Sequence, residues 1–273
     1  MDGEQDNMKR LLISNIASTL IVFVLNMLAS MGVINNRTTG QLSDKLPNLF
    51  VPSGVTFSIW GVIYTLLLLF IIRQARGLLS KDAEGAVHVR KIGWFFALSN
   101  LANSMWIFAW HYELVPLSLV FMALLFVSLL AVYLRLGIGK SEAVLSLREK
   151  LFFHVPFSVY LGWITVAAIA NVTAFLVWAG TPPYTQTAVI WTVLVIAVAA
   201  LIGFLMLWTR RDATYGLVIV WALIGIVMKR LDAHYFRELT VATTAGIAAS
   251  AITVMSVVTL LRTRIASSSK RDP

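Results

Sequence analysis

Stretches of apolar residues long enough to cross a bilayer recur along the chain and are separated by polar segments. A membrane-spanning helix needs about 20 apolar residues, within a range of roughly 17–25. Eight stretches meet this need, and none carries an Asp, Glu, Lys or Arg before its final residue. They are 11–34, 55–73, 92–110, 116–134, 155–179, 187–208, 213–229 and 240–261. The pattern predicts an all-α integral membrane protein with eight transmembrane helices.

The composition agrees with this pattern and excludes a soluble globular fold. Hydrophobic residues make up 59% of the chain and charged residues 13%, against averages of about 45–50% and about 25% for soluble proteins. The chain has no cysteine, which excludes disulfides, thiolate metal sites and cysteine nucleophiles.

Basic residues alternate in number from loop to loop, and this alternation predicts the orientation. With eight spans, 17 of the 22 Lys and Arg residues fall on the side that holds both termini, and 5 fall on the other side. Cytoplasmic loops carry the excess of Lys and Arg in polytopic proteins. We therefore expect a multi-pass protein of the cell membrane with both termini in the cytoplasm. The net charge of +9 is explained in the same way, and nucleic acid is not an expected partner.

Several classes of chemistry are excluded by what the spans lack. Carboxylate, Lys and Arg side chains at membrane depth usually mark proton relays, ion paths and voltage sensors, and none is present here. The sequence also has no Gly-rich phosphate loop, GxSxG or HExxH motif, and its histidines lack metal-ligand spacing. We predict no catalytic residue, no metal site and no required cofactor.

Aromatic and carboxamide side chains lie in register on three of the predicted helices. Residues three, four or seven apart share a helix face. The candidates are Trp60 and Tyr64 on the second helix, Asn103 and Trp106 on the third, and Tyr160, Trp163, Ala167 and Asn171 on the fifth. They could be aromatic residues at the membrane interface and polar residues that form hydrogen bonds between helices. Alternatively, they could be the walls of a pocket for a flat, mostly apolar ligand. Trp94 and Trp110, near helix ends, are interpreted as interfacial belt residues.

The fifth helix has the spacing that a recess would need. Trp163 and Asn171 are eight residues apart, so they point into one quadrant about 12 Å apart along the axis. Ala167 lies midway between them and leaves room for a ring. Trp163 would offer a stacking face and Asn171 a hydrogen-bonding group.

Three segments resemble a known family. Residues 52–64, PSGVTFSIWGVIY, resemble P-P-G-W-V-F-G-P-V-W-T-x-x-Y; residues 103–106, NSMW, resemble N-x-A-W; and residues 160–171 resemble Y-L-x-W-x-x-x-A-x-x-x-N. These are signatures of the translocator protein, or tryptophan-rich sensory protein (TspO/MBR), family. The chain departs from these signatures at Val55, where the family has Trp, and at Val159, where the family has Pro. The family's proline before its second Trp is either replaced by Ser58 or lost in a one-residue gap.

The resemblance implies a domain organisation. Residues 11–179 would form a TspO-like five-helix bundle, residues 187–261 would add three helices that the family lacks, and residues 1–10 and 262–273 would be cytoplasmic tails. The small residues of the last helix, Ala242, Ala245, Gly246 and Ala249, favour close packing on the core bundle or on a second copy of the chain in a homodimer.

The resemblance also implies a function. The family bundle binds tetrapyrroles and, in some members, sterols, and the matched positions would make the pocket. We expect a membrane sensor or regulator that binds a planar hydrophobic molecule, such as a porphyrin or haem-type ligand, in contact with membrane lipid. Transport of that ligand and a ligand-free scaffold are the alternatives. Porphyrin breakdown, reported for part of the family, is disfavoured by Val55.

Overall fold

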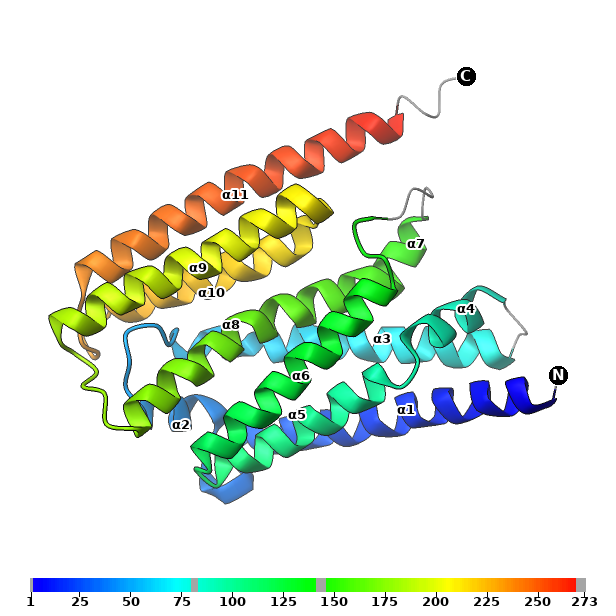
Figure 1. Ribbon diagram of the computed structural model, residues 1–273, viewed down its shortest axis with the longest axis horizontal. Helices are drawn as coiled ribbons and strands as arrows, with labels where there is room; N and C mark the ends of the chain where they lie inside the picture. The colour runs from blue at the N-terminus through cyan, green and yellow to red at the C-terminus, as the bar shows by residue number, and fades with distance from the viewer. Residues whose placement is uncertain (1, 80–82, 141–145, 269–273) are drawn as a thin grey trace.

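The computed structural model describes residues 2–79, 83–140 and 146–268, and almost all of them are helical (Figure 1). The short elements are η1 (Ile34–Asn36), α2 (Thr39–Lys45), η2 (Gly54–Ser58), α4 (Ala83–Ile92), α7 (Leu147–Glu149) and the π-helical turn η3 (Lys150–His154). The long helices are α1 (Asp2–Ser30), α3 (Ile59–Leu79), α5 (Phe95–His111), α6 (Val115–Arg135), α8 (Val155–Trp178), α9 (Gln186–Arg210), α10 (Ala213–Leu231) and α11 (Leu239–Ser268).

The long helices match the apolar stretches of the sequence. Among the described residues, seven are long and apolar enough to cross a membrane. The remaining one, α5, has 17 residues, at the lower limit for a span. It packs against α1 and α6 and runs beside them in Figure 1. An all-helical membrane protein is therefore confirmed, with seven helices that satisfy the length requirement.

The helices form two packed groups. In the first, α5 packs on α1 and α6, and α8 packs on α3 and α6; in the second, α9, α10 and α11 pack on one another. The two groups meet mainly where α10 lies on α8. At this contact a Cβ on Gly162 would lie 3.1 Å from Cβ of Val218, so glycine allows the two helices to approach closely.

A buried carboxylate joins the two groups near the start of α10. Asp212 caps α10 by accepting a hydrogen bond from the backbone N–H of Tyr215 at 3.1 Å. Its other oxygen accepts from the hydroxyl of Tyr133 on α6 at 2.9 Å and from that of Ser158 on α8 at 2.6 Å. A carboxylate is costly to bury unless it is hydrogen-bonded, and these three donors satisfy it.

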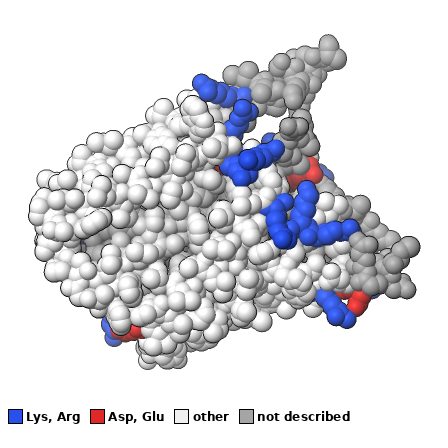
Figure 2. All heavy atoms as spheres, viewed as in Figure 1, with Lys and Arg blue, Asp and Glu red and all other residues white. Residues whose placement is uncertain are grey.

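Charged side chains lie near the two ends of the face seen in Figure 2. In Figure 2, Lys and Arg gather at one end of the bundle, and a wide uncharged belt separates them from a small charged patch at the other end. The first turn of α1 and the last turn of α11 lie at the basic end in Figure 1. This separation is what a bilayer requires of a membrane-spanning bundle.

The segment between α1 and α3 folds back over the end of the bundle opposite the basic end. Leu49, Phe50 and Val51 are at most 2% exposed, and ion pairs hold α2 at both sides. Lys229 of α10 pairs with Asp44, and Lys45 pairs with Glu113 after α5. This segment is therefore a packed cover of the bundle, and residues 39–58 are called the cover segment below.

Candidate functional site

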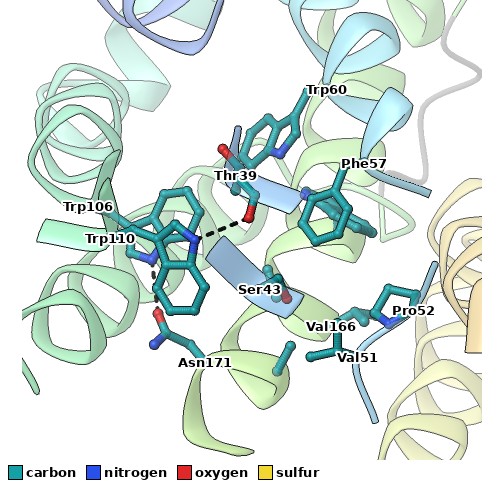
Figure 3. A pocket seen from close by; sticks show the side chains of 13 residues that line it. Thr39, Ser43, Val51, Pro52, Phe57, Trp60, Trp106, Trp110, Val166 and Asn171 are labelled. Atoms are coloured by element: carbon teal, nitrogen blue, oxygen red, sulfur yellow. Dashed lines mark hydrogen bonds between the residues drawn. The ribbon is translucent and has the colours of Figure 1, made fainter. Parts of the chain in front are cut away.

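A small, mostly apolar cavity lies beneath the cover segment, between α3, α5 and α8 (Figure 3). Its volume is about 40 Å³. Its lining is Thr39, Ser43, Val51, Pro52, Phe57, Trp60, Trp106, Trp110, Trp163, Val166, Ala167, Ala170 and Asn171. Four tryptophans on three helices thus surround one space, with a single carboxamide among them.

Five of the eight residues expected from the sequence line this cavity. They are Trp60, Trp106, Trp163, Ala167 and Asn171. The family-like segments on α3, α5 and α8 therefore meet in space, although they are more than 100 residues apart at the extremes. That these side chains bind a ligand stays a prediction.

The other three expected residues form a hydrogen-bonded group that does not line the cavity. Asn103 donates to the hydroxyl of Tyr64 at 3.0 Å and to that of Tyr160 at 2.7 Å. Trp60 stacks on Tyr64, with ring centroids 5.7 Å apart, and meets Tyr160 edge-on. The group therefore supports the cavity wall from behind, because it fixes the ring of Trp60.

Asn171 is held by two partners. The indole N–H of Trp106 donates to its Oδ1 at 2.9 Å, a bond drawn in Figure 3, and its own Nδ2 donates to Ser118 Oγ at 3.0 Å. Fully satisfied buried networks rigidify the side chains that they join. Asn171 therefore presents a fixed polar edge to the cavity. A ligand that donates a hydrogen bond to Asn171 Oδ1 would share this oxygen with the indole N–H of Trp106.

Trp163 differs because its polar group has no partner. The side chain is 2% exposed, and its Nε1 makes no hydrogen bond with the described residues. Trp60 and Phe57 pack edge-on against its ring, at centroid distances of 6.3 and 5.8 Å. A buried N–H without an acceptor costs roughly 1–3 kcal/mol. A ligand with a hydrogen-bond acceptor in the cavity would remove this cost.

Sequence patterns missed the part of the lining that comes from outside the spans. The cover segment contributes Thr39, Ser43 and Val51 from outside the predicted spans, and no helical period could have indicated them. Trp110 is another correction, because it is not an exposed belt residue. It is 6% exposed, stacks on Trp106 and donates to the backbone oxygen of Thr39 at 3.4 Å (Figure 3).

Helix α10 fixes the cover segment although it does not line the cavity. The backbone N–H of Ser53 donates to the Gly225 oxygen at 3.0 Å, and the indole N–H of Trp221 donates to the Thr56 oxygen at 2.9 Å. A Cβ on Gly225 would lie 2.1 Å from Thr56 Oγ1 and 2.9 Å from Pro52 Cβ. The second helix group therefore determines where one wall of the cavity lies.

The cavity as it stands admits water but no large molecule. A water needs roughly 10–15 Å³ of such volume, whereas drug-sized ligands occupy pockets of roughly 300–1,000 Å³. The described residues contain no group of three or more His, Asp or Glu side chains that could hold a metal ion. The arrangement suits apolar contact, ring stacking and a few hydrogen bonds.

These features define the class: a polytopic α-helical membrane protein with an aromatic cavity between α3, α5 and α8. The family model described as TSPO-like protein matches residues 12–258, so the chain belongs to this family. The match runs past residue 179 and includes α9, α10 and most of α11, which the resemblance of the motifs had left outside it. No curated protein and no solved structure is detectably similar to the chain.

Proposed function

We propose that this protein is a membrane sensor or regulator that binds a planar, mostly apolar molecule of the tetrapyrrole or sterol kind in the tryptophan-lined cavity. The observation that carries the proposal is the unpartnered indole N–H of Trp163, buried beside Trp60 and Phe57 in the wall of a mostly apolar space. A ring with a carbonyl or carboxylate at its edge has the two features that this wall recognises, a flat apolar face and an acceptor.

Binding of such a molecule requires the cavity to expand. The cover segment is the part able to move, since α2 is a helix of seven residues that is held by ion pairs and by the bond from Trp110 to Thr39. The pair of Lys45 with Glu113 is exposed and is worth about 0–1 kcal/mol, whereas the Lys229 side chain that pairs with Asp44 is 6% exposed and anchors the other side of α2. Outward movement of the Lys45 end of α2 would therefore cost least and would open the space above Trp60, Trp106 and Trp163.

We further propose that α5 crosses the membrane, which gives eight spans and places both termini in the cytoplasm. Seventeen residues at 1.5 Å each give a helix of about 26 Å, close to the hydrocarbon thickness of about 30 Å. The support is the division of 17 against 5 basic residues, together with the first turn of α1 and the last turn of α11, which lie at the basic end of the bundle. The rule that Lys and Arg collect in the cytoplasmic loops of polytopic proteins is the basis on which we propose the cell membrane as the location.

Fluorescence titration tests the binding proposal. Protoporphyrin is added to the purified full-length protein in detergent, and quenching of tryptophan emission is followed to saturation. Trp163→Phe keeps an aromatic face but removes the N–H, so we expect binding weakened about 5- to 30-fold, as for a lost buried hydrogen bond of about 1–2 kcal/mol. The matched control is Trp191→Phe, at a 62% exposed position on α9, which should bind as the wild type does. Absence of saturable quenching, or equal weakening in both variants, would contradict the proposal.

A further inference from the structure

A second hollow lies between α9 and α11, away from the tryptophan-lined cavity. Its volume is about 450 Å³. It is lined by Leu207, Trp208, Arg211, Met255, Val258, Thr259 and Arg262. These residues belong to the last turn of α9, to its C-cap Arg211 and to the second half of α11. The hollow therefore lies at the basic end of the bundle, and is called the α9–α11 groove below.

The groove combines apolar walls with positively charged side chains. Met255, Val258 and Leu207 give it apolar walls, and Arg211 and Arg262 stand among them as exposed cations. Neither arginine forms an ion pair with a carboxylate of the described residues. The lining contains no acidic side chain. An occupant that complements it must carry a negative charge at one end and an apolar body at the other.

The two adjacent arginines that end α9 point to different neighbours. Arg210 reaches the first helix group, where it donates to the Ile138 oxygen at 3.4 Å and lies over the ring of Tyr133. Arg211 ends the helix in the left-handed conformation, at φ 52°, and lines the groove. Arg210 thus contributes to packing inside the protein, and Arg211 contributes its positive charge to the groove.

Trp208 marks the depth of the groove in the membrane. Its side chain is 78% exposed, one turn before Arg211. Indole rings collect at the level of the lipid headgroups, and arginines near helix ends reach toward the same level. The apolar walls then face acyl chains while the two guanidinium groups lie among the headgroup phosphates.

We propose that the α9–α11 groove binds one anionic phospholipid of the cytoplasmic leaflet, with the phosphate between Arg211 and Arg262 and an acyl chain along Met255 and Val258. Basic pockets between transmembrane helices on the cytoplasmic side bind acidic lipid headgroups in this manner. This site is independent of the proposed ligand cavity and shares no residue with it.

Native mass spectrometry of the full-length protein tests the proposal. Detergent-solubilised protein is mixed with dioleoyl phosphatidylglycerol or with dioleoyl phosphatidylcholine, and bound lipid is counted. We expect one phosphatidylglycerol to be retained in preference to phosphatidylcholine. The double variant Arg211→Gln/Arg262→Gln should weaken this binding roughly 20- to 30-fold, because each basic residue near the headgroups is worth about a fivefold preference.

The matched control removes the same charge at the same end of the molecule. Lys9→Gln/Arg10→Gln lies on α1, outside the groove, and should change the affinity less than twofold. Val258→Trp keeps both arginines, fills the apolar part and should also weaken binding. Equal losses in the two charge variants, equal binding of both lipids, or saturation by inorganic phosphate at the same affinity would overturn the proposal.

Discussion

Replacing Asp212 with alanine should loosen the junction between the two helix groups. The carboxylate accepts three hydrogen bonds, from Tyr133, Ser158 and the backbone N–H of Tyr215. Tyr133 is 0% and Ser158 is 2% exposed, so water cannot replace the lost acceptor. Loss of a helix cap costs about 1 kcal/mol, and each bond to a charged group is worth about 1.5–3 kcal/mol. Since the two hydroxyls can partly find other partners, we expect a total loss of about 3–5 kcal/mol.

The assay is thermal unfolding of purified protein in one detergent at one scan rate. At about 2–4 °C per kcal/mol, Asp212→Ala should lower Tm by roughly 6–20 °C. Asp212→Asn keeps the capping oxygen and the size of the side chain, and should lose only about 1–2 kcal/mol. A Tm of Asp212→Ala within 2 °C of wild type would refute the view that this carboxylate joins the groups, as would an asparagine variant as unstable as the alanine variant.

Two further predictions concern α10 and the topology. Gly225→Ala should push the cover segment away from α10, lower the free energy of unfolding by about 1–3 kcal/mol and weaken protoporphyrin binding. The control Gly246→Ala, whose Cβ would meet only Val227 at 3.9 Å, should have none of these effects. Unchanged protoporphyrin binding by Gly225→Ala would show that α10 does not position the cavity wall. Because the chain has no cysteine, single cysteines report sidedness: Tyr112→Cys and Thr181→Cys should react with an impermeant maleimide from outside intact cells, and Ser268→Cys only after permeabilisation. If α5 did not cross while the other long helices did, Tyr112→Cys and Thr181→Cys would both be protected and Ser268→Cys would react from outside.

The spans could be predicted from the sequence because a bilayer imposes a length and a composition on each helix. The predicted 116–134 and 155–179 correspond to Val115–Arg135 and Val155–Trp178. The residues at which the helices end near water could be predicted less accurately. The helix α1 begins at Asp2, within the polar segment 1–10, since helical hydrogen bonding continues where hydrophobicity has stopped.

The site was predictable where it is built from helix faces. Spacing on one helix brought Trp163, Ala167 and Asn171 together, and the structure places all three at the cavity. Spacing on separate helices does not tell which face turns inward at a given depth. Asn103 therefore lies in the hydrogen-bonded group behind Trp60, and Trp110 reaches the cavity through its contact with the cover segment.

Polar residues at helix boundaries were the hardest to interpret. Asp212 stands one residue before the predicted span 213–229, where an acidic residue is commonly just a helix cap. Its two additional donors come from α6 and α8, 79 and 54 residues away in sequence, and only the packing of α10 on α8 brings them together. Such long-range partners leave no local pattern in the sequence.

The central claim is that the tryptophan-lined cavity is the binding site, and the most direct test compares two substitutions one residue apart on α8. Ala167 lines the cavity and Ala168 does not, and both are partly buried against the core. Ala167→Leu adds three carbon atoms to a space of about 40 Å³, while leucine is favourable in a membrane helix. Protoporphyrin affinity of the two folded variants is measured by tryptophan quenching: the account predicts binding abolished in Ala167→Leu and retained in Ala168→Leu. Binding by Ala167→Leu at the wild-type affinity would contradict it.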